Sequence, residues 1–279
     1  MDLIHTVLQN TSDVKICEIC CRIMEKLSRE KMNRRAMVEQ GAIESISTIC
    51  KINYGKVLLV HSLTTEQRAY GKKENMIVNP IEGTNVNNET YKKLIRISIR
   101  TLKQLSSSVV APCALMVEDG AVVLARTLAS VTFSGKQVED IATMISNVSY
   151  AAPLHEIAND GGLYLLGRCI SGSRDSVTLE RCAIGMYNIS TLANNHTIMS
   201  NENAHLLLIR LASENPFLVK TIRFAAMSIC SLTMQDSVRS SMVRSGITEP
   251  MCALHSLLKK NSNDELTMKC IALSLSNLR

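Results

Sequence analysis

The chain has 279 residues, of which 46% are hydrophobic, 3% aromatic and 20% charged, and its formal net charge is +6. No run of consecutive Lys or Arg residues is longer than two. This argues against nucleic acid as the main partner, because a phosphate-binding surface concentrates positive charge. No signal peptide and no membrane-spanning segment are predicted, since residues 1–14 lack a basic start and no stretch of 18 apolar residues exists.

The first predicted elements are a short apolar helix over residues 3–8 and a longer helix over residues 14–28, separated by a polar turn. The same succession returns at residues 207–233, where it forms the second and third helices of a longer unit. The chain is therefore expected to open in the middle of a repeat.

A sharp turn recurs along the chain, each time after a short run of mixed apolar and polar residues. Its glycines are Gly41, Gly120, Gly161 and Gly246. In one copy the slot falls on Asn203, and Asn also tolerates positive φ at low cost, so the sharp turn is expected to survive there. A short apolar helix is predicted after most of these turns.

Residues 53–90 interrupt the pattern. Leu27 and Leu105, which hold equivalent places, are 78 residues apart, nearly two periods, and no clean copy of the unit lies between them. Two interpretations remain open: an insertion between the second and third helices of one unit, which we favour, or a degenerate extra unit. The segment is expected to be partly disordered.

The ends of the long helices carry a second signature. Val148, Ile189, Leu232 and Leu278 end apolar helical runs at spacings of 41, 43 and 46 residues, and together with Leu27 and Leu105 they are called the anchors here. A period in the forties indicates stacked helical repeats. One unit reads as short helix, Gly turn, medium helix, polar turn and long helix. Pro216 is predicted in the first turn of its long helix.

The turns "VEQGAI", "VEDGAV", "ANDGGL" and "VRSGIT", with the helix ends "SNVS", "YNIS" and "SNLR", resemble the armadillo repeat family. This resemblance implies an all-α fold, a right-handed superhelical α-solenoid of three-helix repeats. Residues 1–279 would form a single array of about six units that opens and closes within a repeat. Such ends expose apolar stacking surface, so further repeats or partner subunits are expected to cover them.

Catalytic chemistry is not predicted. The sequence has no Gly-rich phosphate loop, dinucleotide fingerprint, His-Glu-x-x-His or Gly-x-Ser-x-Gly, and its six His residues are isolated. The ten Cys residues largely follow the core stripe, so they are interpreted as small buried hydrophobes in a reducing compartment. We therefore expect no enzyme activity, no catalytic residue, no metal site and no cofactor.

The resemblance implies that the long helices line a concave groove, with the residues one and five places before each anchor projecting into it. These twelve ladder positions are Arg22, Lys26, Arg100, Gln104, Thr143, Asn147, Ile184, Asn188, Met227, Ser231, Leu273 and Asn277. Their Asn, Gln and Ser side chains are able to hydrogen-bond an extended peptide, at ~1 kcal/mol each. The alternative role for the Asn residues is capping of their own helix ends.

Nuclear import adaptors of this family pair each such Asn with a Trp one helical turn earlier. This chain has no Trp, so recognition of a basic peptide by that mechanism is not expected. The first two pairs of ladder positions are basic and the later ones neutral to apolar, which fits an extended partner segment with an acidic end and an apolar end. Glu18, Glu139 and Glu180 lie on adjacent helical turns and are expected to pair with some basic side chains.

The sequence thus predicts a protein-interaction scaffold whose partners are proteins, located in the cytoplasm or on cytoskeletal or ciliary structures, with the nucleus left open. One alternative is a structural component of a cytoskeletal or ciliary assembly that contacts partners through the array ends and residues 53–90. Another, from a different class, is a regulatory armadillo domain of a larger enzyme such as a ubiquitin ligase.

Overall fold

The computed structural model describes residues 1–54, 89–108, 110–131, 133, 135–151, 154–261 and 264–279. These residues form helices and no strand, so the predicted all-α class is confirmed. They divide into two compact units, Met1–Phe133 and Ser134–Arg279. Each unit is described by itself, and the single continuous array stays a prediction.

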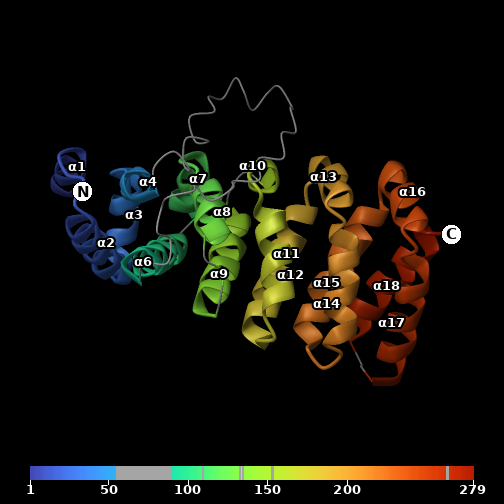
Figure 1. Ribbon diagram of the computed structural model, residues 1–279. Coiled ribbons are helices and arrows are strands. Elements are labelled where there is room, and N and C mark those ends of the chain that lie inside the picture. Colours follow the sequence, from blue (N-terminus) through green and yellow to red (C-terminus); the bar gives the residue numbers. More distant parts are fainter. Residues whose placement is uncertain (55–88, 109, 132, 134, 152–153, 262–263) are drawn as a thin grey trace. The chain divides into compact units, whose positions relative to one another are not determined.

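Unit 1 begins with a medium and a long helix, as the sequence predicts, and then continues with the short, medium and long helices of one repeat and the first two helices of the next. Its helices are α1 (Asp2–Gln9), α2 (Val14–Arg29), α3 (Lys31–Glu39), α4 (Ala42–Tyr54), α6 (Glu89–Ser106), α7 (Val110–Glu118) and α8 (Ala121–Val131) (Figure 1). Most of the predicted 53–90 insertion lies outside the described residues.

Unit 2 continues the same order of helix lengths. Its elements are α9 (Lys136–Ala151), α10 (Leu154–Asn159), α11 (Gly162–Gly172), α12 (Ser176–Ser190), the 3-10 turn η2 (Ala193–Asn195), α13 (His196–Asn201), α14 (Ala204–Glu214), α15 (Val219–Thr233), α16 (Asp236–Arg244), α17 (Thr248–Asn261) and α18 (Glu265–Asn277). The long helices α9, α12, α15 and α18 pack successively on one another. We call these four, with α2 and α6 of unit 1, the third helices.

The predicted sharp turns between short and medium helices are confirmed at all five places. Gly41, Gly120, Gly161 and Gly246 have φ values of 78°, 82°, 95° and 77°. Asn203 has φ of 55° and is the one non-Gly residue in the described part of the chain with positive φ. The left-handed conformation that Gly adopts without steric cost is therefore kept where Asn replaces it.

Pro216 does not lie where the sequence predicts. Helix α15 begins at Val219, and Pro216 precedes it in a turn closed by a 3.0 Å hydrogen bond from the Leu218 N–H to the Asn215 carbonyl. Pro216 is the second residue of that turn, a place that its fixed φ also suits. The prediction was wrong because the fixed φ of Pro suits both the first turn of a helix and the second residue of a turn.

The anchors are core residues, with one exception. Leu105, Val148, Ile189 and Leu232 are fully buried and Leu278 is nearly so, whereas Leu27 on α2 is 40% exposed. A fully buried aliphatic side chain contributes about 1.5–3 kcal/mol relative to an exposed one. The interiors of both units are therefore stabilised mainly by aliphatic packing between successive helices.

All ten cysteines are free thiols, and seven of them are buried. Burial raises the pKa of Cys21 to about 12 and that of Cys113 to about 11, so these thiols stay protonated and unreactive. The interpretation as small buried hydrophobes therefore holds for the seven. Cys230 and Cys270 are only half-buried and Cys252 is exposed.

His205 at the start of α14 is a buried titratable side chain. It is 1% exposed, and its Nε2 lies 2.8 Å from the Ser245 hydroxyl, 40 residues further along the chain. The Nδ1 atom is buried without a hydrogen-bond partner in the described structure. Burial lowers the pKa of His205 below its ordinary value of 6.5, because the charged form loses its hydration.

Unfolding of the protein is expected to become easier as the pH falls below about 6.5, in part through His205. The unfolded chain binds the proton at a higher pH than the folded chain, so protonation favours unfolding between the two pKa values, by at most about 1.4 kcal/mol per pH unit. His205→Gln should reduce the slope of unfolding free energy against pH, measured by urea titration between pH 5 and 7. An unchanged slope in the variant would contradict this assignment.

Candidate partner-binding surface

The ladder positions lie on accessible faces of the third helices. All twelve are at least partly exposed: Arg22, Lys26 and Leu273 are exposed and the other nine are intermediate. The first four belong to unit 1 and the other eight to unit 2. The ladder positions are therefore accessible in both units, while the gradient from a basic to an apolar end remains a prediction.

The polar residues directly before the anchors bridge neighbouring third helices. The Asn188 Nδ2 donates to the Ser149 Oγ (3.2 Å), and the Asn277 Nδ2 donates to the Thr233 Oγ1 (3.2 Å). The Ser231 hydroxyl donates to the Ser190 carbonyl (2.7 Å). In each case the acceptor residue directly follows the anchor of the preceding third helix.

Unit 1 repeats this contact, because the Ser28 hydroxyl donates to the Gln104 side-chain carbonyl across α2 and α6. The four bridges hold successive helices in register, a role that neither predicted alternative, groove binding or capping, includes. The sequence carried a signal for it: an Asn, Gln or Ser before the anchor recurs with a Ser or Thr after the anchor of the preceding copy. Asn188 and Asn277 act as donors in these bridges, so their side-chain oxygens remain as acceptors. The Asn277 Nδ2 also donates to the Met234 Sδ, at 3.7 Å.

Arg22 and Arg100, two of the basic ladder positions of unit 1, form ion pairs. Arg22 lies 2.8 Å from Glu18 on its own helix, and Arg100 lies 3.5 Å from Glu25 on α2. Glu18 is shared with Lys93, also at 2.8 Å, and the hydrogen bond from Lys93 lowers the pKa of Glu18, with Arg22 adding to the shift against the opposing effect of burial. The expected local pairing is therefore confirmed for Glu18.

Glu139 and Glu180 in unit 2 also pair, with Lys136 and with Lys220 respectively. The Lys220 ammonium lies 3.5 Å from the Glu180 carboxylate and joins α15 to α12. These charged side chains are mostly well exposed, so each pair contributes little to stability, on the order of 0–1 kcal/mol.

The accessible face of unit 2 also carries apolar side chains. Ile184 and Met227 are half-buried, and Leu273 is 48% exposed, on the successive helices α12, α15 and α18. The rings of Tyr187 and Phe224, on α12 and α15, lie 5.5 Å apart. The sequence analysis did not select this aromatic pair, although both residues occupy partly exposed positions of third helices. Partly exposed aliphatic and aromatic side chains on adjacent helices suit apolar side chains of a bound segment.

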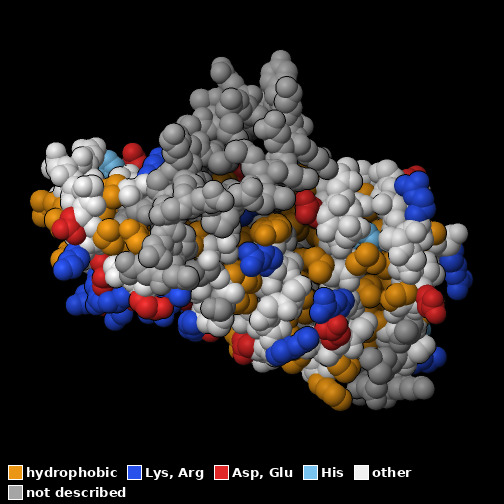
Figure 2. Space-filling model, in the orientation of Figure 1, with side chains coloured by type: hydrophobic (Ala, Val, Ile, Leu, Met, Phe, Trp, Pro, Cys, Tyr) orange, Lys and Arg blue, Asp and Glu red, His pale blue; other side chains and the backbone are white. Residues whose placement is uncertain are grey.

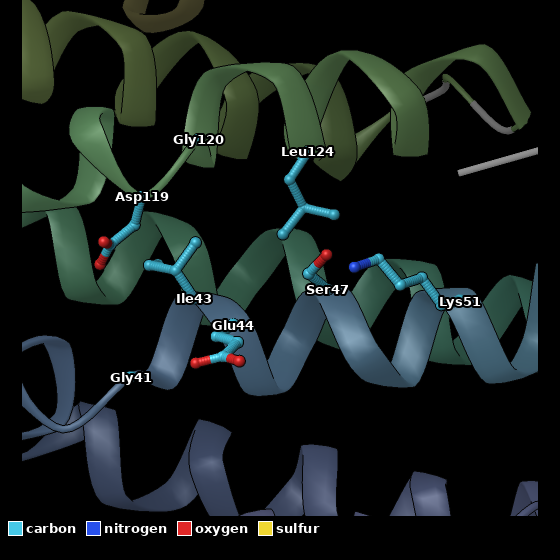
Figure 3. Close-up of a pocket in the computed structure, with 8 residues that line it drawn as sticks. All are labelled: Gly41, Ile43, Glu44, Ser47, Lys51, Asp119, Gly120 and Leu124. Carbon is cyan, nitrogen blue, oxygen red and sulfur yellow. The ribbon is translucent and has the colours of Figure 1, made fainter. Parts of the chain in front are cut away.

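Unit 1 also contains a pocket of about 300 Å³ between α4 and the start of α8, which the sequence analysis did not predict. It is lined by Gly41, Ile43, Glu44, Ser47, Lys51, Asp119, Gly120 and Leu124. Figure 3 shows the carboxylates of Glu44 and Asp119 toward one end and Ser47 and Lys51 toward the other. Burial, with the negative charges of Glu118 and Glu44, raises the pKa of Asp119. The pocket thus has two carboxylates toward one end and one Lys side chain toward the other.

The described residues lack both a cluster of metal ligands and a helix able to cross a membrane. No three His, Cys, Asp or Glu side chains there come together as metal ligands would. None of the described helices combines the length and the hydropathy that crossing a bilayer requires.

Comparison with known proteins identifies a fold class. No protein-family model matches the chain, and no curated protein matches it. Three crystal structures of engineered proteins from the Northeast Structural Genomics Consortium are similar to it, with TM-scores of 0.60, 0.59 and 0.53 and sequence identities of 17%, 14% and 18%. The matches cover 100%, 100% and 99% of this chain, and 97%, 99% and 67% of the engineered chains.

At these identities the similarity concerns the fold alone. The class that the fold defines is therefore an all-helical protein built from recurring helices.

Proposed function

We propose that this chain is an armadillo-type protein-interaction scaffold that binds extended segments of other proteins along the face formed by its third helices. It acts by binding, without catalysis or a cofactor. The observation that carries the proposal is the row of partly exposed apolar side chains at the same position of three successive helices: Ile184, Met227 and Leu273.

The armadillo assignment within the helical class is supported by the recurrence of one local plan. Five turns with positive φ each separate a short helix from a medium one, and a long helix follows where the residues are described. Bridges between residues flanking the anchors recur in both units. A repeated plan of this kind builds a surface that grows with each copy, which suits long, extended ligands better than compact ones.

The chemistry of the face indicates the kind of segment that it accepts. Unit 2 offers apolar side chains beside the amides of Asn188 and Asn277, so it suits alternating apolar side chains and main-chain polar groups. Unit 1 offers Lys26, and beside it Arg22 and Arg100, whose guanidinium groups pair with Glu18 and Glu25 but stay partly exposed; these basic groups favour acidic residues. The proposed partner segment is accordingly acidic in one part and apolar in another.

Replacing Ile184 and Leu273 by Asp is expected to remove partner binding while the protein stays folded, since both side chains are partly exposed. The measurement is affinity capture of partners by the wild type and by the variant, read by quantitative mass spectrometry and followed by titration of the captured partner. Burying an unpaired carboxylate against apolar side chains should weaken binding by tenfold or more, which is about 1.4 kcal/mol or above.

Val243→Asp is the matched control, because Val243 is 45% exposed on α16, a short helix outside the proposed surface. The control should keep the full set of partners. If the double variant and the control retain the same partners with the same affinities, the third-helix face is not the binding surface.

A further inference from the structure

Helix α2 carries an exposed apolar stripe. Ile16, Ile19, Ile23 and Leu27 are 37%, 56%, 43% and 40% exposed. Their spacing of three, four and four residues places them on one side of the helix. Figure 2 shows hydrophobic side chains together with Lys and Arg at the N-terminal end of the chain, where Figure 1 places α1 and α2.

The residues at the equivalent places of the next third helix, α6, are buried. They lie 78 residues further on: Leu94, Ile97, Thr101 and Leu105. Helix α6 packs extensively on α2, and Cys21 of α2 contacts the Ser98 hydroxyl of α6 at 3.6 Å. The stripe on α2 thus repeats a helix-docking face.

The basic residues beside the stripe on α2 also have equivalents on α6. On α6, Lys93 and Arg100 pair with Glu18 and Glu25 of α2, at 2.8 Å and 3.5 Å. The two basic residues are seven positions apart from each other, and so are the two acidic residues. Helix α2 has Lys15 and Arg22, again 78 residues before Lys93 and Arg100 and seven positions apart.

Unit 2 contains one of these pairs in the same register. Lys220 lies 12 residues before its anchor Leu232, as Lys93 does before Leu105. Its partner Glu180 lies nine residues before Ile189, as Glu18 does before Leu27. A basic residue on one third helix facing an acidic residue on the preceding one is therefore a recurring element of helix stacking in this protein.

We propose that the exposed face of α2, formed by the stripe with Lys15 and Arg22, docks an acidic amphipathic helix of another protein. The partner helix carries an apolar stripe and two carboxylates seven positions apart, and it lies on α2 as α2 lies on α6. Its carboxylates pair with Lys15 and Arg22. Arg22 already pairs with Glu18, but its guanidinium has five N–H groups and is half-exposed, so it is able to hold a second carboxylate.

A second copy of this chain stacked head to tail through α18 fits the face poorly. The helix that would stack next in a head-to-tail assembly is α18, and its residue nine places before Leu278 is Lys269. Lys269 would face Lys15. Ser276, two residues before Leu278, stands at the place that Glu25 holds before Leu27. Like charges in that register oppose association, whereas a helix with carboxylates at both places is attracted.

The test uses a fluorescently labelled synthetic helical peptide as long as α2, with a leucine stripe and two glutamates seven positions apart. Fluorescence polarisation measures its affinity for the intact protein. Lys15→Glu together with Arg22→Glu should weaken binding about tenfold, since two attractive pairs become repulsive. A peptide with lysines in place of the glutamates should bind the doubly charge-reversed variant better than it binds the wild type.

Ile19→Asp with Ile23→Asp should abolish binding, and Val177→Asp, at a 54% exposed position of α12, should leave it unchanged. Circular dichroism checks that each variant is folded. Equal affinity of the wild type and the charge-reversed variant, no binding to the wild type, or loss from Val177→Asp alone would overturn the proposal. Self-association of the wild type that Ile19→Asp dissolves, seen by sedimentation velocity, would assign the face to a second copy instead.

Discussion

Ile189→Ala is expected to lower the free energy of unfolding by about 2–5 kcal/mol, the range for truncating a fully buried aliphatic side chain. Ile189 is an anchor with no exposed surface, on α12, which packs between α9 and α15 within unit 2. The truncation removes apolar contacts and leaves a cavity that the surrounding helices fill only in part. Denaturant titration followed by circular dichroism measures the loss.

Ile184→Ala is the matched control on the same helix. Ile184 occupies a ladder position five residues earlier and is only half-buried, so its truncation should cost less than about 1.5 kcal/mol. Equal losses from the two substitutions would show that the anchor is no better packed than the accessible face, which would contradict the repeat alignment. Hydrogen exchange should also reveal that Ile189→Ala loosens α12 and its neighbours first, because each copy contacts only adjacent copies.

Gly162→Ala is the second change with a large expected effect, a loss of about 1–3 kcal/mol in the free energy of unfolding. A Cβ at Gly162 would lie 2.6 Å from the Ile157 Cγ2 and 2.7 Å from the Ile157 carbonyl oxygen. The second contact is with backbone, so α10 and α11 must move apart at the turn formed by Gly161. Thermal unfolding measured by calorimetry gives the change.

Gly167→Ala tests whether this effect comes from the close approach or from the loss of a glycine as such. Gly167 lies in the same helix, and its added Cβ would meet only the end of the Leu207 side chain, at 3.0 Å. Because Ala is favoured over Gly inside a helix by about 1 kcal/mol, this variant should be close to the wild type or more stable. If Gly167→Ala is the more damaging substitution, the Gly162 contact does not determine the packing of the turn.

Several features of the fold could be predicted because their causes are local. Gly and Asn in a five-fold recurring slot predict positive φ, and the φ values of 82° at Gly120 and 55° at Asn203 confirm it. The order of short, medium and long helices followed from apolar periodicity and the spacing of the anchors. Pro216 shows the limit of this reasoning, since two local structures accept the same dihedral angle.

The candidate surface was predictable only in part. The accessible positions on the third helices follow from helical periodicity, so all twelve ladder positions are at least partly exposed. Their partners did not follow, because Asn188 and Ser149 meet across 39 residues of chain. Whether an Asn caps its own helix or bridges to the next depends on the distance between two helices, and helix packing determines that distance.

By itself, the sequence determined an all-helical chain of recurring units, its sharp turns and the side of each long helix that stays accessible, because these properties depend on dihedral preferences and on periodicity along a single helix. Only the tertiary structure decided which polar side chains join neighbouring helices, which ion pairs form, and that the apolar stripe of α2 stays exposed while its counterpart on α6 is buried. Those outcomes depend on which second helix lies alongside, and the same side chain is buried or exposed according to that neighbour.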